Sequence, residues 1–163
     1  MVRKVFYSFH YKPDNWRASQ VRNIGKVEGN KAASDNDWET VTKGGDNAIK
    51  KWINDQMNGR SCAVVLIGKD TAGRKWINYE IEKAWEDGKG VLGIYIQDLK
   101  DSEGNQTTKG KNPFSGYKIG DTAMDQIVKT YDPPYSDSQE AYGWIEDNIE
   151  DWIEAAIKIR EKY

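Results

Sequence analysis

One carboxylate stands out among the side chains that could do chemistry. Residues 76–87 predict a helix whose apolar side is built from Ile77, Ile81, Ala84 and Trp85. Glu82 and Glu86 fall on the opposite side, whereas Glu80 falls at the rim of the apolar side, one turn after Trp76. This semi-buried position, in the first turns after a strand and beside a tryptophan, makes Glu80 the candidate functional residue. The alternative is a boundary glutamate whose stem covers the core.

Several familiar active sites are excluded by the turns that follow the predicted strands. Gly68-Lys69 is followed by Asp70, with no glycine at the spacing that a P-loop requires. The turn from Ser8 to Pro13 has no glycine, which excludes a Rossmann phosphate loop, and it has no paired carboxylates of the kind that receiver domains use. Ser8, His10 and Asp14 compose a hydrolase triad on paper, but no Gly-x-Ser-x-Gly elbow is present.

Metal and cofactor chemistry has little support in the residue types. The chain has one cysteine and one histidine, Cys62 and His10, which cannot form a Cys/His zinc cluster. Cys62 lies inside an apolar run and is expected to be a small buried side chain. We expect no metal and no resident cofactor.

Composition indicates one globular domain that binds neither nucleic acid nor membrane. The 163 residues, taken as one domain over 1–163, carry 24 basic and 26 acidic side chains and a net charge of −2. A nucleic-acid-binding domain would be basic. The N-terminal residues lack the apolar stretch of a signal peptide, and no apolar run reaches the length of a membrane span. The sequence thus predicts a cytoplasmic protein.

Strands and helices alternate along the chain. Apolar segments predict strands over Val5–Phe9, Cys62–Ile67, Val91–Ile96 and Ile127–Tyr131. The strand over 62–67 is apolar on both faces, as in the centre of a parallel sheet. The predicted fold class is α/β, with a single doubly wound, mainly parallel sheet and helices on both faces.

Helix boundaries follow from capping and breaking residues. Pro13-Asp14 predicts a helix start with Asp14 as N-cap, followed by Trp16, Ser19 or Gln20, and Ile24 at helical spacing. A second helix, with Ile49, Trp52, Ile53 and Met57 as its stripe, ends at Asn58-Gly59. After Pro133-Pro134, Ser136 and Gln139 match a capping box that opens the terminal helix. The aromatic and aliphatic stripe of that last helix is typical of core rather than of a ligand site.

The edge at which parallel strands end is where such sheets bind ligands. This rule predicts one pocket lined by His10, the turn 68–75 and Glu80. Two long polar segments, 25–45 and 98–120, have no assigned role, and a short strand around 38–41 is a further expectation. Long loops are often functional, so we expect the segment 98–120 at or near the mouth of the pocket.

Two blocks of sequence resemble a known family. Thr71 followed by Trp76-Ile77-Asn78-Tyr79-Glu80 is similar to the TIR-domain pattern of small residues, then Trp, then Glu four residues later. The opening block Val5-Phe6-Tyr7-Ser8-Phe9-His10-Tyr11 resembles the first strand and turn of TIR-like proteins of bacterial anti-phage Thoeris systems, the ThsB type. The segments 22–25, 27–29 and 93–96 also fit that branch. The segments 25–45 and 98–120 depart from the usual TIR pattern in their length.

The resemblance implies an enzyme of antiviral defence that has NAD⁺ as its substrate. It would cleave the nicotinamide–ribose bond and make an ADP-ribose-derived, cyclic signalling nucleotide that activates a separate effector protein. The resemblance assigns the catalytic role to Glu80 and substrate contacts to Tyr7, Ser8, Phe9 and His10, and an aromatic face such as Trp76 would stack on a ring of NAD⁺. The acceptor of the ADP-ribosyl group and any homo-oligomer remain open.

The chemistry needs few groups, because nicotinamide leaves as a neutral ring without a general acid. Only the oxocarbenium-like ribose needs stabilisation, and one carboxylate is enough. Two other functions stay open at this point. One is a non-catalytic TIR scaffold that acts by protein assembly, and the other is a flavodoxin-like nucleotide-binding module.

Overall fold

A four-stranded parallel sheet forms the centre of the protein. The computed structural model describes residues 2–30 and 41–163. The strands are β1 (Val5–Ser8), β2 (Cys62–Ile67), β3 (Gly90–Tyr95) and β6 (Thr130–Tyr131), in the order β1-β2-β3-β6. All neighbouring pairs are parallel, so the four strands end at the same edge of the sheet.

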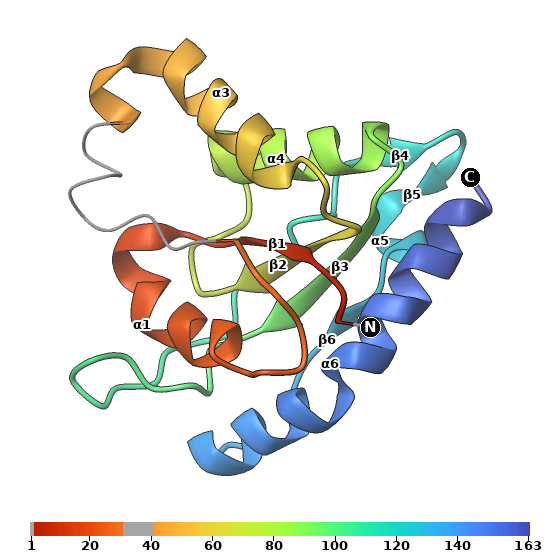
Figure 1. The fold of residues 1–163 in the computed structure, drawn as a ribbon. Coiled ribbons are helices and arrows are strands. Elements are labelled where there is room, and N and C mark those ends of the chain that lie inside the picture. The colour runs from red at the N-terminus through yellow and green to blue at the C-terminus, as the bar shows by residue number, and fades with distance from the viewer. Residues whose placement is uncertain (1, 31–40) are drawn as a thin grey trace.

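Helices cover both faces of this sheet (Figure 1). On one face α1 (Tyr11–Arg22) and α6 (Ser138–Glu161) pack against one core cluster. On the other face α3 (Gly45–Met57), α4 (Lys75–Glu86) and the short α5 (Met124–Ile127) pack against a second cluster. The predicted α/β fold class is confirmed, and β2 is an interior strand with all six residues buried.

The face that α1 buries differs from the predicted one. The helix begins at Tyr11 with His10 as N-cap, so Asp14 lies inside its first turn and is not the cap. Of the predicted stripe, Ile24 is buried as expected, but Trp16 is 53% exposed. Asp14 and Arg17 face the interior instead and neutralise each other there. A charged pair can therefore occupy a helix face that apolar periodicity alone assigns to solvent.

Two further boundaries differ from the expectations. The N-cap of α6 is Asp137, whose carboxylate accepts a hydrogen bond from the Glu140 N–H at 3.0 Å, so the Ser136–Gln139 capping box does not form. The last strand is reduced to Thr130–Tyr131, because residues 124–127 form α5 and bury Met124 and Ile127 on one side.

The long polar segment 98–120 is anchored to the body of the protein. Leu99 and Phe114 are almost fully buried, and the segment ends in a small antiparallel hairpin of β4 (Lys118–Ile119) and β5 (Thr122–Ala123). Of the other polar segment, residues 31–40 are outside the described part, and with them most of the strand expected around 38–41. Among the described residues no helix is long and apolar enough to cross a membrane.

Close packing of α6 on the sheet gives a first prediction. A Cβ atom on Gly90 would lie 2.8 Å from the Ile157 N atom and 2.9 Å from the Ala156 carbonyl carbon, both in the backbone of α6. Backbone cannot swing aside as a side chain can, so Gly90→Ala should lower the free energy of unfolding by about 1–3 kcal/mol. Urea denaturation measures this change.

The matched control for Gly90 lies on α6 itself. A Cβ atom on Gly143 meets nothing within 4 Å, and the residue is in the helix interior. Gly143→Ala should raise stability by roughly 0.5–1 kcal/mol. Equal effects of the two alanines would show that α6 does not rest on β3 as closely as described.

Candidate active site

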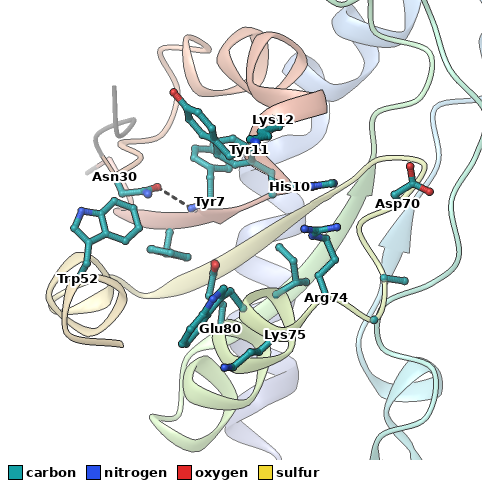
Figure 2. A pocket seen from close by; sticks show the side chains of 16 residues that line it. Tyr7, His10, Tyr11, Lys12, Asn30, Trp52, Asp70, Arg74, Lys75 and Glu80 are labelled. Carbon is teal, nitrogen blue, oxygen red and sulfur yellow. Dashed lines mark hydrogen bonds between the residues drawn. The ribbon is translucent and has the colours of Figure 1, made fainter. Parts of the chain in front are cut away.

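A cavity opens at the carboxyl-terminal edge of the sheet. Its volume is about 700 Å³, and Figure 2 shows it between β1, α3 and the start of α4. Its walls come from β1 and the first turn of α1, from α3, and from the turn and helix that follow β2. The lining residues are Phe6, Tyr7, Phe9, His10, Tyr11, Lys12, Asn30, Trp52, Asp70, Ala72, Gly73, Arg74, Lys75, Trp76, Ile77 and Glu80.

Most residues predicted for the site meet in this cavity. His10, the turn residues 70 and 72–75 and Glu80 line it together, as do Tyr7, Phe9 and Trp76. The ring of Tyr7 belongs to the core cluster of the α1–α6 face, however, so this side chain points away from Glu80. Ser8 is 1% exposed and is not among the lining residues.

The segment 98–120 does not line this cavity, although it reaches Asp70, which does. The segment packs behind the turn that follows β2, where a Cβ on Gly110 would collide with the Gly68 carbonyl oxygen. It also contributes Asp101, Gln106 and Thr107 to a second cavity of about 320 Å³.

Glu80 is more deeply buried than the rim position expected for it. It lies on the inner face of α4 with Ile77, Ile81 and Ala84, and it is 8% exposed. Its Oε2 atom and the Ser8 Oγ atom are both sealed from solvent, and neither has a hydrogen-bond partner among the described residues. A buried polar atom without a partner costs folding free energy and is a common mark of a functional site.

Burial changes the acidity of this carboxyl. Loss of solvation raises the pKa of Glu80 from 4.5 to about 8, and the nearby Ser8 hydroxyl offsets only part of the rise. The neutral acid therefore predominates at pH 7 in the protein alone. A cation placed beside Glu80 would favour the carboxylate and lower this pKa again.

The raised pKa of Glu80 predicts a stability that falls with increasing pH. Between pH 4.5 and about 8 the folded protein keeps a proton that the unfolded chain has released. Folding thus loses about 1.4 kcal/mol per pH unit across this window, and the loss is complete above it. Glu80→Gln has no such proton. The unfolding free energy of the variant should therefore rise relative to that of the parent from pH 5 to pH 8, and the difference should stay constant above pH 8.

Urea unfolding at five pH values from 5 to 9 measures this difference. Other titrating groups, such as His10, are common to both proteins and cancel in the comparison. A difference in unfolding free energy that does not change with pH would show that Glu80 titrates as an exposed glutamate does.

His10 occupies the turn between β1 and α1, where it is the N-cap of the helix. Burial, and secondly the nearby Arg74 guanidinium, lower the pKa of its imidazole, while Asp70 opposes the shift. The ring is therefore neutral at pH 7. Its Nδ1 atom is buried without a partner among the described residues.

Two further features of the lining were not predicted from the sequence, namely the positive charge of one part and the contribution of Asn30 and Trp52. Lys12, Arg74 and Lys75 give one part of the cavity a positive charge. Lys75 also pairs with Asp46 and lies over the Trp76 ring, 4.9 Å from its centroid. Asn30 and Trp52 form another part of the wall. The Val27-Glu28-Gly29 block of the family pattern ends next to Asn30 and was the one available signal for that residue.

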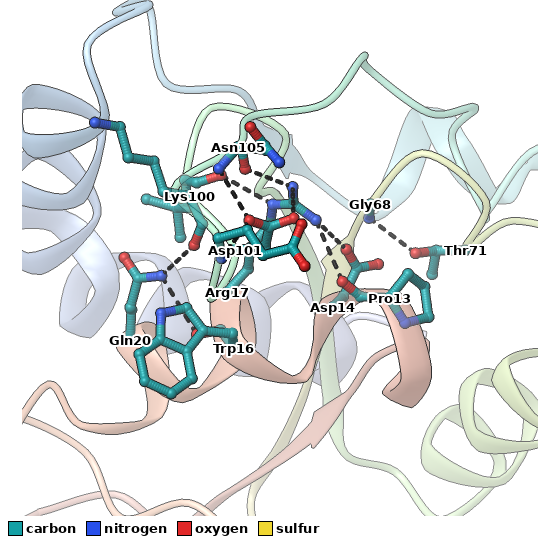
Figure 3. Close-up of polar contacts among 12 residues, drawn as sticks. Pro13, Asp14, Trp16, Arg17, Gln20, Gly68, Thr71, Lys100, Asp101 and Asn105 are labelled. Carbon is teal, nitrogen blue, oxygen red and sulfur yellow. Dashed lines mark hydrogen bonds and ion pairs between the residues drawn. The ribbon is translucent and has the colours of Figure 1, made fainter.

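A buried ion pair supports the turn that lines the cavity (Figure 3). Arg17 Nη1 donates to Asp14 Oδ1 at 3.1 Å, and both side chains are almost fully buried. Arg17 also donates from Nε to the Leu99 carbonyl at 2.9 Å and from Nη2 to the Asn105 carbonyl at 2.8 Å. A Cβ on Gly68 would collide with Asp14 Oδ2, so the pair packs directly on the end of β2.

The chemical capacity of the cavity follows from these groups. Among residues 2–30 and 41–163 no cluster of His, Cys, Asp or Glu side chains could hold a metal ion. The cavity instead combines one buried carboxyl, aromatic walls and a cationic part. This set suits a ligand that has both flat rings and negative charge.

Comparison with known proteins identifies the family. The family model described as Thoeris protein ThsB, TIR-like domain, matches residues 6–101, which include every predicted site residue. A Bacillus cereus (strain MSX-D12) protein named "Putative cyclic ADP-D-ribose synthase ThsB1" is 40% identical over 125 residues, 72% of this chain and 65% of that protein. The match thus spans just under two thirds of the relative's length. The chain belongs to the ThsB family of Thoeris TIR-like domains.

Proposed function

We propose that this protein cleaves the nicotinamide–ribose bond of NAD⁺ and that Glu80 is the catalytic residue. The observation that carries the proposal is a buried carboxyl whose Oε2 atom has no hydrogen-bond partner among the described residues, in a cavity at the edge where the strands end. The name of the 40% identical relative, "Putative cyclic ADP-D-ribose synthase ThsB1", supports the same reaction.

The proposed chemistry uses the charge of the substrate. The nicotinamide ring of NAD⁺ is cationic, so its arrival favours the carboxylate form of Glu80. As the bond to ribose breaks, the positive charge moves to the sugar and the nicotinamide leaves as a neutral ring. A carboxylate beside the sugar gains in interaction energy as that charge develops, which is selective stabilisation of the transition state.

The remaining groups take supporting roles in this proposal. Lys12 and Arg74 provide positive charge for the diphosphate, and Phe9 and Trp76 provide aromatic surface for the rings. Ser8 lies beside Glu80, sealed from solvent, and lowers the pKa of the carboxyl rather than touching NAD⁺. His10, neutral at pH 7, contacts a ribose hydroxyl or a phosphate oxygen.

The product of this reaction is proposed to be a cyclic ADP-ribose derivative. This nucleotide would act in the cytoplasm as a signal to a separate effector protein of antiviral defence. The protein would make it either as a monomer or as a homo-oligomer. The effector would bind the nucleotide and would not contact this protein.

Incubation of the purified protein with NAD⁺ tests the proposal. We expect free nicotinamide, together with a product of the mass of ADP-ribose less one water, both seen by mass spectrometry. The mass distinguishes cyclisation from hydrolysis, because hydrolysis retains the water. Absence of nicotinamide, also in lysate from phage-infected cells, would favour a non-catalytic TIR scaffold.

A further inference from the structure

Asn30 lines the candidate active site, and its side-chain amide is held by the backbone of β1. It is 5% exposed, and the Tyr7 backbone N–H donates to its Oδ1 atom at 2.8 Å. A backbone N–H can only donate, so the amide oxygen must face Tyr7 and the Nδ2 group must point elsewhere. Nδ2 donates to no described residue, although Asn30 lines the cavity.

The backbone around Asn30 is held on three sides. Glu28 pairs with the edge of β1, where the Val5 N–H donates to its carbonyl at 2.8 Å. Gly29 passes so close to the Tyr7 ring that a Cβ would lie 2.6 Å from the ring. Arg22 donates to the Asn30 carbonyl at 2.8 Å. The side-chain amide therefore has a set direction before any ligand binds.

The polar groups of the cavity follow one another along β1 and the residues after it. Asn30 is bonded at Tyr7, Glu80 lies beside Ser8, and Arg74 and Asp70 act on His10. An extended chain advances roughly 3.3 Å per residue, so the three positions, from Tyr7 to His10, span about 10 Å. Figure 2 shows the same arrangement, with Asn30 and Trp52 on one side of Glu80, and His10 and Arg74 on the other.

This order matches the order of groups in NAD⁺. The ribose must lie at Glu80, and the diphosphate belongs with the cationic Arg74 and Lys12. The nicotinamide, which is attached on the other side of the ribose, then extends toward Asn30 and Trp52. The nicotinamide carries one strong acceptor, its carboxamide oxygen, and an amide N–H is the complementary group.

We infer that Asn30 recognises the leaving group, donating from Nδ2 to the carboxamide oxygen of nicotinamide, with the ring lying against Trp52. This inference rests on the proposed function for the orientation of NAD⁺. It makes Asn30 a specificity-determining residue and predicts that the pocket discriminates among pyridine rings by their 3-substituent.

Asn30→Asp isolates the donor from the structural bond. The carboxylate keeps an oxygen for the Tyr7 N–H, replaces the Nδ2 donor by an acceptor and adds a negative charge. We measure the binding of free nicotinamide, 3-acetylpyridine and pyridine by NMR titration, which needs no turnover. The parent protein should bind the first two rings more tightly than pyridine, and the variant should lose at least about tenfold for those two and nothing for pyridine.

Asn78→Asp, on α4 and outside the cavity lining, is the matched control and should not change the three affinities. Equal affinity of the parent for nicotinamide and pyridine would overturn the inference. An equal loss for all three rings in Asn30→Asp, or a similar loss in Asn78→Asp, would also overturn it, because it would indicate a general structural effect.

Turnover separates this inference from the proposed function. NAD⁺ and its analogue with an unsubstituted pyridinium ring carry the same charge, so the ratio of their kcat/KM values cancels the effect of the charge that the substitution adds. Asn30→Asp should reduce this ratio about tenfold or more. If the parent binds nicotinamide selectively but never cleaves NAD⁺, then the proposed function fails and the recognition by Asn30 stands.

Discussion

Glu80→Gln is expected to reduce nicotinamide release from NAD⁺ by about 10²–10³-fold, the usual cost of removing a group that stabilises developing charge. Glutamine keeps the size of the side chain and its position on the inner face of α4. It cannot become a carboxylate when the cationic substrate arrives. The loss should fall on kcat rather than on the affinity for NAD⁺, because the charge interacts most strongly with the transition state.

Glu82→Gln and Glu86→Gln serve as matched controls for this substitution. Both side chains are exposed on the same helix, and neither lines the cavity. Nicotinamide release is measured for the parent and all three variants under the same conditions, and their melting temperatures are measured alongside. If Glu80→Gln retains the turnover of the parent, or if the controls lose as much, then Glu80 is a structural glutamate and the scaffold function gains support.

The main strands could be predicted because their apolar runs are buried on both faces. The run 62–67 could only be an interior strand, and residues 91–95 follow the same rule. Short elements were harder to predict. Residues 127–131 have strand-forming composition, yet Met124 and Ile127 are buried together only when residues 124–127 form a helical turn. That preference depends on the second core cluster and not on local sequence.

Some residues of the candidate site could likewise be predicted from the sequence, and others could not. Glu80 and His10 were predictable, because the rule that parallel sheets bind ligands at their carboxyl-terminal edge needs only strand order. Asn30 and Trp52 come from segments that reach the cavity through tertiary packing, by the Glu28 pairing with β1 and by α3. The depth of Glu80 was missed for a related reason. A helical wheel shows the angle of a side chain but not the wall opposite, which here is Ser8 of β1.

Arg17→Met is expected to lower the free energy of unfolding by about 3–5 kcal/mol, the range for breaking a buried ion pair on one side. The side chains of Arg17 and Asp14 are 5% and 3% exposed. Methionine fills much of the space but leaves the Asp14 carboxyl buried without a counter-charge. It also removes the hydrogen bonds to the Leu99 and Asn105 carbonyls. Urea denaturation of the variant and the parent measures the loss.

The double variant Asp14→Asn, Arg17→Met decides whether the buried charge causes this loss. Burial already raises the pKa of Asp14, and the Arg17 guanidinium opposes that rise. Without Arg17, a neutral amide at position 14 should be better tolerated than the carboxyl, so the double variant should recover a substantial part of the stability at pH 7. A double variant no more stable than Arg17→Met would assign the loss to the other partners of Arg17, which are the Pro13, Leu99 and Asn105 carbonyls and the Asp101 carboxylate. The ion pair also bears on the candidate site, because Asp14 packs against Gly68, directly after the end of β2. Nicotinamide release should therefore fall with stability in Arg17→Met, because the turn after Gly68 carries Arg74 and leads into α4, and so to Glu80.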